Sequence, residues 1–181
     1  MTNKWTIVDA LRHSRHDWLN RLQLIKANLS LGNVERVQEL IDEFVGEAQQ
    51  EARLMSLGMP LFSELLLTYG WEGFSCHLEY EVLGEIQDLS HFDEALYTWA
   101  KSFCATLHSA LHVYTENHLC ITITCEDEDV CFFFDFRGKL TDKLDLEQWL
   151  NQQEESLFRI SYSLSQEELS VQLQLKNSKV W

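Results

Sequence analysis

The chain has 181 residues and a mass of 21.3 kDa, which allows one compact domain or one domain with a small helical module. Its 45% apolar and 24% charged residues exclude a disordered or low-complexity protein. The 14 basic and 29 acidic residues give a net charge of −15, which disfavours binding to nucleic acid or to a membrane surface.

Hydropathy and cysteine usage both indicate a cytoplasmic protein. No apolar run approaches the roughly 20 residues that span a bilayer, and the first 18 residues hold no uninterrupted hydrophobic stretch that would suit a signal peptide. None of the five cysteines is paired in a C-x-x-C motif, so we expect reduced, mostly buried thiols without zinc or disulfides.

His108 and His112 have the i, i+4 spacing of a metal pair, but a third ligand and an HExxH pattern are missing, so we expect no bound metal.

Two long helices are predicted at the start of the chain. The first covers residues 5–31, and the second begins at Val34 and ends near Gly58-Met59-Pro60. Gly32 suits the end of the first helix and Asn33 the start of the second, so the pair should form an antiparallel hairpin. Two helices alone cannot bury two apolar seams. We therefore expect a homodimer that closes a four-helix bundle, the alternative being packing of the hairpin on the rest of the chain.

The remaining sequence predicts a self-sufficient α+β sandwich, with helices on one face of hairpin-like strands. We place the domain boundary so that residues 1–59 form the hairpin and residues 60–181 form this second domain. Helices are expected at 62–71, 92–115 and 145–153, and strands at 77–82, 119–125, 130–136, 157–164 and 169–175.

His16 is the candidate reactive residue of the first helix. With about 100° per residue, His16 lies opposite the apolar seam and at the centre of a polar stripe that includes Arg12, Asn20 and Gln23. The members of the seam are Ile7, Leu11, Trp18, Leu22, Ile25 and Leu29. An exposed imidazole is largely uncharged near neutral pH, and it can accept a phosphoryl group and pass it on.

The neighbours of His16 are candidate helpers or docking residues. Asn20 lies one turn away and can hydrogen-bond the ring or a phosphoryl oxygen, while Arg15 and Asp17 flank the stripe. Leu19 lies off the seam as an apolar docking residue, and His13 is either a rival acceptor or a steering group. Residues 1–26 carry five basic and two acidic groups, a balance of +3 that suits an anionic partner site such as the acidic pocket of a receiver domain.

The sequence HSRHDWLNRLQLIKANLSL at 13–31 closely resembles the sporulation initiation phosphotransferase B family of bacilli. Further matches are LEYEVLGEI at 78–86, DLS at 88–90 and ENHL at 116–119, so the resemblance spans most of the chain. The HDxxN core is also similar to the phosphoacceptor helix of citrate-type sensor kinases.

The resemblance implies a dimeric four-helix bundle and a C-terminal domain like the ATPase domain of histidine kinases. It implies that His16, with Arg15, Asp17 and Asn20 beside it, takes a phosphoryl group from one receiver domain. His16 then gives the group to a second receiver, the regulator that starts sporulation. Mg²⁺ would be supplied through the partner receiver and not bound by this chain.

The kinase pattern is incomplete in the C-terminal domain. Ser109 stands where such kinases keep the asparagine that holds Mg-ATP, and Gly138 is the last glycine, at the wrong spacing for a D-x-G-x-G loop. Without those glycines, side chains would keep phosphates from approaching the backbone, so we expect no ATP binding and no autokinase activity. The alternatives are a non-catalytic dimeric scaffold that binds response regulators, or a sensor-type histidine kinase.

Overall fold

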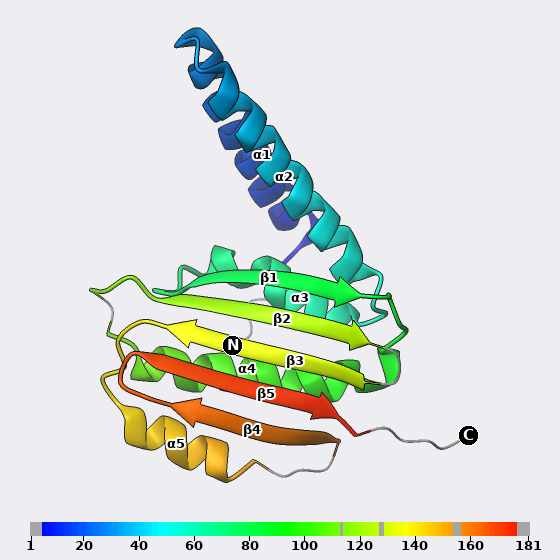
Figure 1. Ribbon diagram of the computed structural model, residues 1–181, viewed down its shortest axis with the longest axis vertical. Coiled ribbons are helices and arrows are strands. Elements are labelled where there is room, and N and C mark those ends of the chain that lie inside the picture. Colours follow the sequence, from blue (N-terminus) through cyan, green and yellow to red (C-terminus); the bar gives the residue numbers. More distant parts are fainter. Residues whose placement is uncertain (1–4, 113, 127–128, 154–156, 177–181) are drawn as a thin grey trace. The chain divides into compact units, whose positions relative to one another are not determined.

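The computed structural model describes residues 5–112, 114–126, 129–153 and 157–176 (Figure 1). The chain divides into two compact units, residues 1–49 and 50–181, which are described separately. The order of elements confirms the predicted α+β class, with a helical hairpin followed by a mixed sheet and its helices.

The hairpin consists of α1 (Ile7–Ser30) and α2 (Val34–Met55). A capping box starts α1: the Thr6 hydroxyl accepts a bond from the Asp9 backbone N–H, and Asp9 accepts one from the Thr6 backbone N–H. At the other end, Gly32 has a φ of 74°, and the Asn33 N–H donates to the Asn28 carbonyl at 3.0 Å. Together with the bond from the Gly32 N–H to the Leu29 carbonyl at 3.1 Å, this bond forms a Schellman turn, which confirms the predicted break.

Two adjacent faces of α1 have different environments. Arg21 lies on the face toward α2, where its guanidinium donates to Glu47 at 2.5 Å and stacks 5.0 Å from the Phe44 ring centre. The apolar seam predicted from the sequence is mostly uncovered: Ile7 is 80% exposed, and Leu11, Trp18, Leu22 and Leu29 are each more than half exposed. No residue of α1 is buried, so α2 covers only part of the apolar surface of this helix.

The second unit is built on a five-stranded sheet with the strand order β1-β2-β3-β5-β4. Strands β1 and β2 are parallel, and the remaining neighbours are antiparallel. The strands are β1 (His77–Gly84), β2 (His118–Glu126), β3 (Asp129–Arg137), β4 (Phe158–Leu164) and β5 (Glu168–Leu175).

Helices pack on one face of this sheet (Figure 1). They are α3 (Pro60–Thr68), α4 (Asp93–Ala110) and α5 (Lys143–Asn151), with short 3₁₀ turns η1 (Tyr69–Glu72) and η2 (Ser90–Phe92). Alternate residues of the central strands are buried beneath them, including Ile121 of β2 and Phe134 of β3, both at 0% exposure. The period of two leaves the opposite sheet face polar and open to solvent.

The predicted helix over 92–115 is wrong at its C-terminal end, because α4 stops at Ala110. Leu111 is extended and pairs with Leu140 as an isolated bridge. The Thr141 N–H donates to the Ala110 carbonyl at 2.7 Å, and the His112 N–H donates to the Lys139 carbonyl at 2.9 Å. Hydrogen bonds to a distant segment thus replace the helical bonds that local periodicity favours.

Two buried polar side chains tie loops and helices together. Asp93 at the start of α4 accepts the backbone N–H groups of Leu61 and Phe62 at 3.0 and 2.9 Å, so it caps the N-terminus of α3. Asn117 is 4% exposed; its amide nitrogen lies 3.0 Å from the Ser75 carbonyl and its amide oxygen accepts from the Lys139 N–H at 3.2 Å.

Candidate functional site

His16 lies in the middle of α1 with its side chain 72% exposed, as the helical wheel predicts. Helical geometry places it away from the residues that contact α2, so the ring is open to a partner. Imidazole presented in this way can approach a group that is carried on another protein.

The polar neighbours of His16 gather at one ring nitrogen. The Asn20 amide nitrogen lies 3.2 Å from Nδ1, and an Asp17 carboxylate oxygen lies 3.4 Å from the same atom. Within the described part of the chain, no hydrogen bond reaches Nε2. When Asp17 accepts a bond from a protonated Nδ1, the lone pair of the neutral ring is on Nε2 and points to solvent.

The other predicted residues divide into anchored and exposed ones. Arg12 donates to Asp9 at 3.1 Å while remaining 64% exposed. The hydrogen bonds from Thr6, followed by the charge of Arg12, lower the pKa of the Asp9 carboxyl. Arg15, Leu19 and Gln23 are exposed on α1.

His13 has an environment that the sequence analysis missed. It is only partly exposed, and its ring meets the Trp5 ring edge-on, with the centroids 5.1 Å apart. Trp5 precedes the helix, so helical periodicity contains no signal for this contact. The geometry makes His13 less accessible than His16 and distinguishes the two histidines, which spacing alone leaves open.

The two positions compared with the kinase pattern have structural roles in the second unit. The Ser109 hydroxyl donates to the Thr106 carbonyl at 2.7 Å near the end of α4. A Cβ at Gly138 would collide with the Asn117 amide oxygen and with the Phe136 ring. Gly138 is therefore required for close packing against Asn117.

His108 is a packing residue of α4. Its ring stacks on Phe74 with the centroids 3.8 Å apart, and Nε2 is hydrogen-bonded to the Tyr69 hydroxyl. Burial disfavours the charged ring and lowers the pKa of His108 to about 4.

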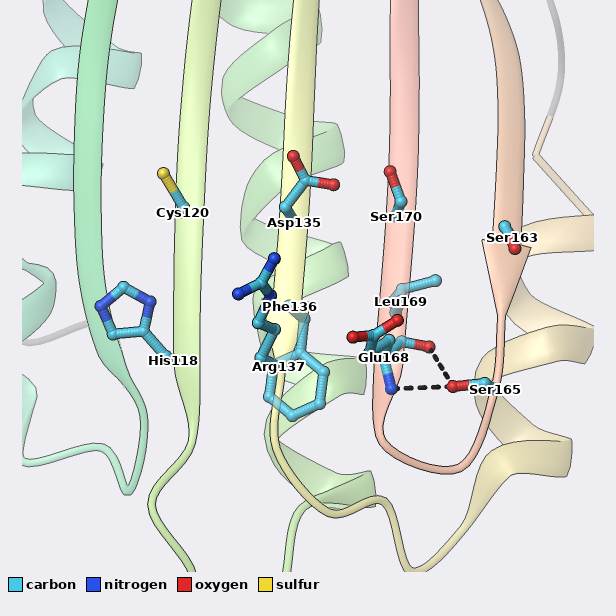
Figure 2. A pocket seen from close by; sticks show the side chains of 10 residues that line it. All are labelled: His118, Cys120, Asp135, Phe136, Arg137, Ser163, Ser165, Glu168, Leu169 and Ser170. Carbon is cyan, nitrogen blue, oxygen red and sulfur yellow. Dashed lines mark hydrogen bonds between the residues drawn. The ribbon is translucent and has the colours of Figure 1, made fainter.

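A polar cavity of about 540 Å³ lies on the sheet face that the helices leave uncovered (Figure 2). Its lining includes His118 and Cys120 of β2, Asp135 and Arg137 of β3, and Glu168 of β5. In Figure 2 these side chains project from the strands on the side opposite the helices. The cavity is within the second unit, and its lining contains none of the residues that the sequence analysis singled out for chemistry.

Sequence comparisons cover both units. The model for the α-helical domain of SpoOB-type sensor kinases matches residues 1–57, and the model for the C-terminal part of sporulation initiation phosphotransferase B matches residues 58–176. The curated sporulation initiation phosphotransferase B of Bacillus subtilis (strain 168) is 40% identical over 144 residues, covering 78% of this chain and 74% of that protein.

Solved structures of histidine kinases are distantly similar. The catalytic domain of histidine kinase ThkA is 9% identical, with a TM-score of 0.43, covering 64% of this chain and 88% of that one. Acinetobacter baumannii histidine kinase AdeS is 10% identical, with a TM-score of 0.40, covering 91% of this chain and 98% of that one. Since both TM-scores are below 0.5, the family assignment rests on the sequence matches.

The chain is a phosphotransferase with a helical N-terminal domain and a C-terminal α/β domain. It belongs to the sporulation initiation phosphotransferase B family, which confirms the resemblance found in residues 13–31 and in the later segments. No helix in the described ranges is both long and apolar enough to cross a membrane.

Proposed function

We propose that His16 accepts a phosphoryl group from the aspartyl phosphate of one receiver domain and donates it to the aspartate of a second receiver that controls sporulation. The observation that carries this proposal is an exposed imidazole whose polar neighbours, Asp17 and Asn20, both lie beside Nδ1. The family membership supplies the class of reaction, and the exposed ring supplies a group that two partners in turn can reach.

In the first step, the Nε2 lone pair forms a bond to phosphorus while the bond between phosphorus and the receiver's aspartate oxygen breaks. The carboxylate leaves, and the ring carries a positive charge shared with the protonated Nδ1. Asp17 stabilises that charge by accepting from the protonated Nδ1. Asn20 orients the ring through its amide oxygen, since its amide nitrogen cannot donate to a protonated Nδ1, or its amide nitrogen binds a phosphoryl oxygen. The second step reverses these bond changes on another receiver.

The receiver holds the Mg²⁺ that neutralises phosphoryl charge in such transfers, so this chain contributes positioning. Its docking surface is the exposed stripe around His16, with Arg12, Arg15, Leu19 and Gln23. The balance of +3 over residues 1–26 favours encounter with the acidic site of a receiver. We place the reaction in the cytoplasm, where the five free thiols would stay reduced.

We also propose that two chains pair through the exposed apolar face of α1 to make a four-helix bundle. An uncovered face of this kind, along a helix without a single buried residue, favours a second copy as its partner.

The transfer is tested by incubating the chain with a receiver domain that carries a radiolabelled phosphoryl group on its aspartate. The wild-type chain should gain label that is acid-labile and base-stable, His16→Ala should gain none, and His13→Ala should still be labelled. Label on His16→Ala would move the acceptor elsewhere. A receiver that binds without losing its label would favour the scaffold alternative.

A separate titration addresses the kinase alternative. We expect no saturable heat when Mg-ATP is titrated into the chain, because the asparagine and glycines of the kinase pattern are missing. Saturable binding would contradict this expectation and favour a sensor-type kinase.

A further inference from the structure

We propose that His77, Glu79 and His118 form a binding site for one divalent transition-metal ion, with Zn²⁺ as the best candidate. The site lies on the open face of the sheet, where the parallel register sets His77 beside His118. Glu79 is two residues along β1 from His77 and therefore projects to the same face.

The ligand atoms are already close to the spacing that a metal requires. Glu79 Oε1 lies 3.3 Å from His77 Nε2 and 3.4 Å from His118 Nε2. With Zn–N and Zn–O bonds near 2.0–2.1 Å, a tetrahedral site separates neighbouring ligand atoms by about 3.3 Å. All three ligand atoms lie within 4.8 Å of one another, so a small rotation of the two imidazoles completes the set.

The donor set identifies the kind of metal. Two imidazoles and one carboxylate suit Zn²⁺ and its neighbours in the first transition row, whereas Mg²⁺ and Ca²⁺ prefer oxygen ligands alone. Three protein ligands leave a fourth position for water or for an external group. The ligand side chains are 70%, 58% and 41% exposed for His77, Glu79 and His118, so an ion can reach them from solvent.

Cys120 is a neighbour of this cluster but not one of its ligands. It pairs with Glu79 in the strand register, yet its sulfur is outside the group of atoms that lie within 4.8 Å.

An ion at this site would link the N-terminal ends of β1 and β2. These strands are separated by more than 30 residues that include α4, and the His77 backbone N–H already donates to the Asn117 carbonyl at 2.8 Å. A metal that binds only the folded chain raises its stability by mass action. The inference concerns the second unit alone and is independent of phosphotransfer at His16.

The test is calorimetric titration of the reduced full-length chain with ZnCl₂. One ion per chain should bind saturably, and bound Co²⁺ should give the visible spectrum of a four-coordinate site without a thiolate charge-transfer band. Loss of an outer-shell partner alone weakens metal sites by about 10–100-fold, so His77→Ala, His118→Ala and Glu79→Gln should each weaken binding by at least about tenfold.

Matched controls keep the result specific. His91→Ala removes an exposed histidine outside the cluster and Cys120→Ser removes the neighbouring thiol, and both should retain wild-type affinity. Circular dichroism checks that each variant is folded, with His77→Gln as a replacement if His77→Ala is not. The absence of saturable binding, wild-type affinity in His77→Ala and His118→Ala, or a loss confined to Cys120→Ser would each overturn the proposal.

Discussion

Asn20 lies one helical turn from His16, with its amide nitrogen 3.2 Å from the Nδ1 atom of the proposed phosphoacceptor ring. We expect Asn20→Ala to slow phosphotransfer by about tenfold or more, because a hydrogen bond to the ring or to the transferred group is lost in the transition state. His16 should remain the labelled residue. Rapid-quench measurement of the transfer rate checks this, and Asn33→Ala, at the hairpin turn, should transfer at the wild-type rate.

Asn117 is also an asparagine, but its buried side chain contributes to stability through hydrogen bonds to loop backbone groups. Its removal in Asn117→Ala would leave several loop carbonyls and the Lys139 N–H without their partner in a buried setting. We expect a loss of about 2–4 kcal/mol in the free energy of unfolding, measured by urea denaturation. The exposed Asn151, which accepts a bond from the Tyr162 hydroxyl, offers a control that should cost about 1 kcal/mol or less on mutation to Ala.

The environment of a residue could be predicted from the sequence only where residues close to it in the chain determine that environment. The exposure of His16 follows from the periodicity of one helix, so the sequence alone was sufficient. The cluster of His77, Glu79 and His118 depends on the register between two strands that are distant in the chain, and no local pattern encodes that register. Our expectation of no bound metal was based only on short-range spacings, such as that of His108 and His112.

At the scale of elements, Asp93 connects two helices that are separate in the sequence. Asp93→Ala removes both acceptors from the start of α3, and we expect a loss of about 1–3 kcal/mol in unfolding free energy. Thermal and urea unfolding measure the effect. The adjacent exposed residue gives the control: Glu94→Ala should change stability by about 0.5 kcal/mol or less, and equal losses in both variants would contradict the capping role.

Element types were predictable because apolar periodicities of 3.6 and 2 residues were clear throughout the chain. The boundaries were less so. Nothing local stops the apolar pattern after Ala110. The helix ends there because Leu111 pairs with Leu140 and the Ala110 carbonyl accepts from the Thr141 N–H. The hairpin turn was predictable because Gly32 and Asn33 are themselves the signal.

At the scale of the whole molecule, the proposed dimer depends on the uncovered apolar face of α1, so mutations on this face test it. The wild-type chain should sediment at twice 21.3 kDa at micromolar concentration. Leu22→Glu places a charge on the exposed seam and should shift the mass to that of one chain, because burying an unpaired carboxylate is strongly unfavourable. Leu19→Glu changes a residue of similar exposure off the seam and should remain dimeric. A monomeric wild-type chain would contradict the proposed bundle.

The lack of any buried side chain in α1 has a consequence for how the enzyme behaves on dilution. In the proposed dimer, a helix with so little packing of its own would gain rigidity from the second chain. Turnover per chain should therefore fall once the concentration drops below the dissociation constant of the pair, even with receivers in excess. Signal strength would then respond to how much of this protein the cell makes.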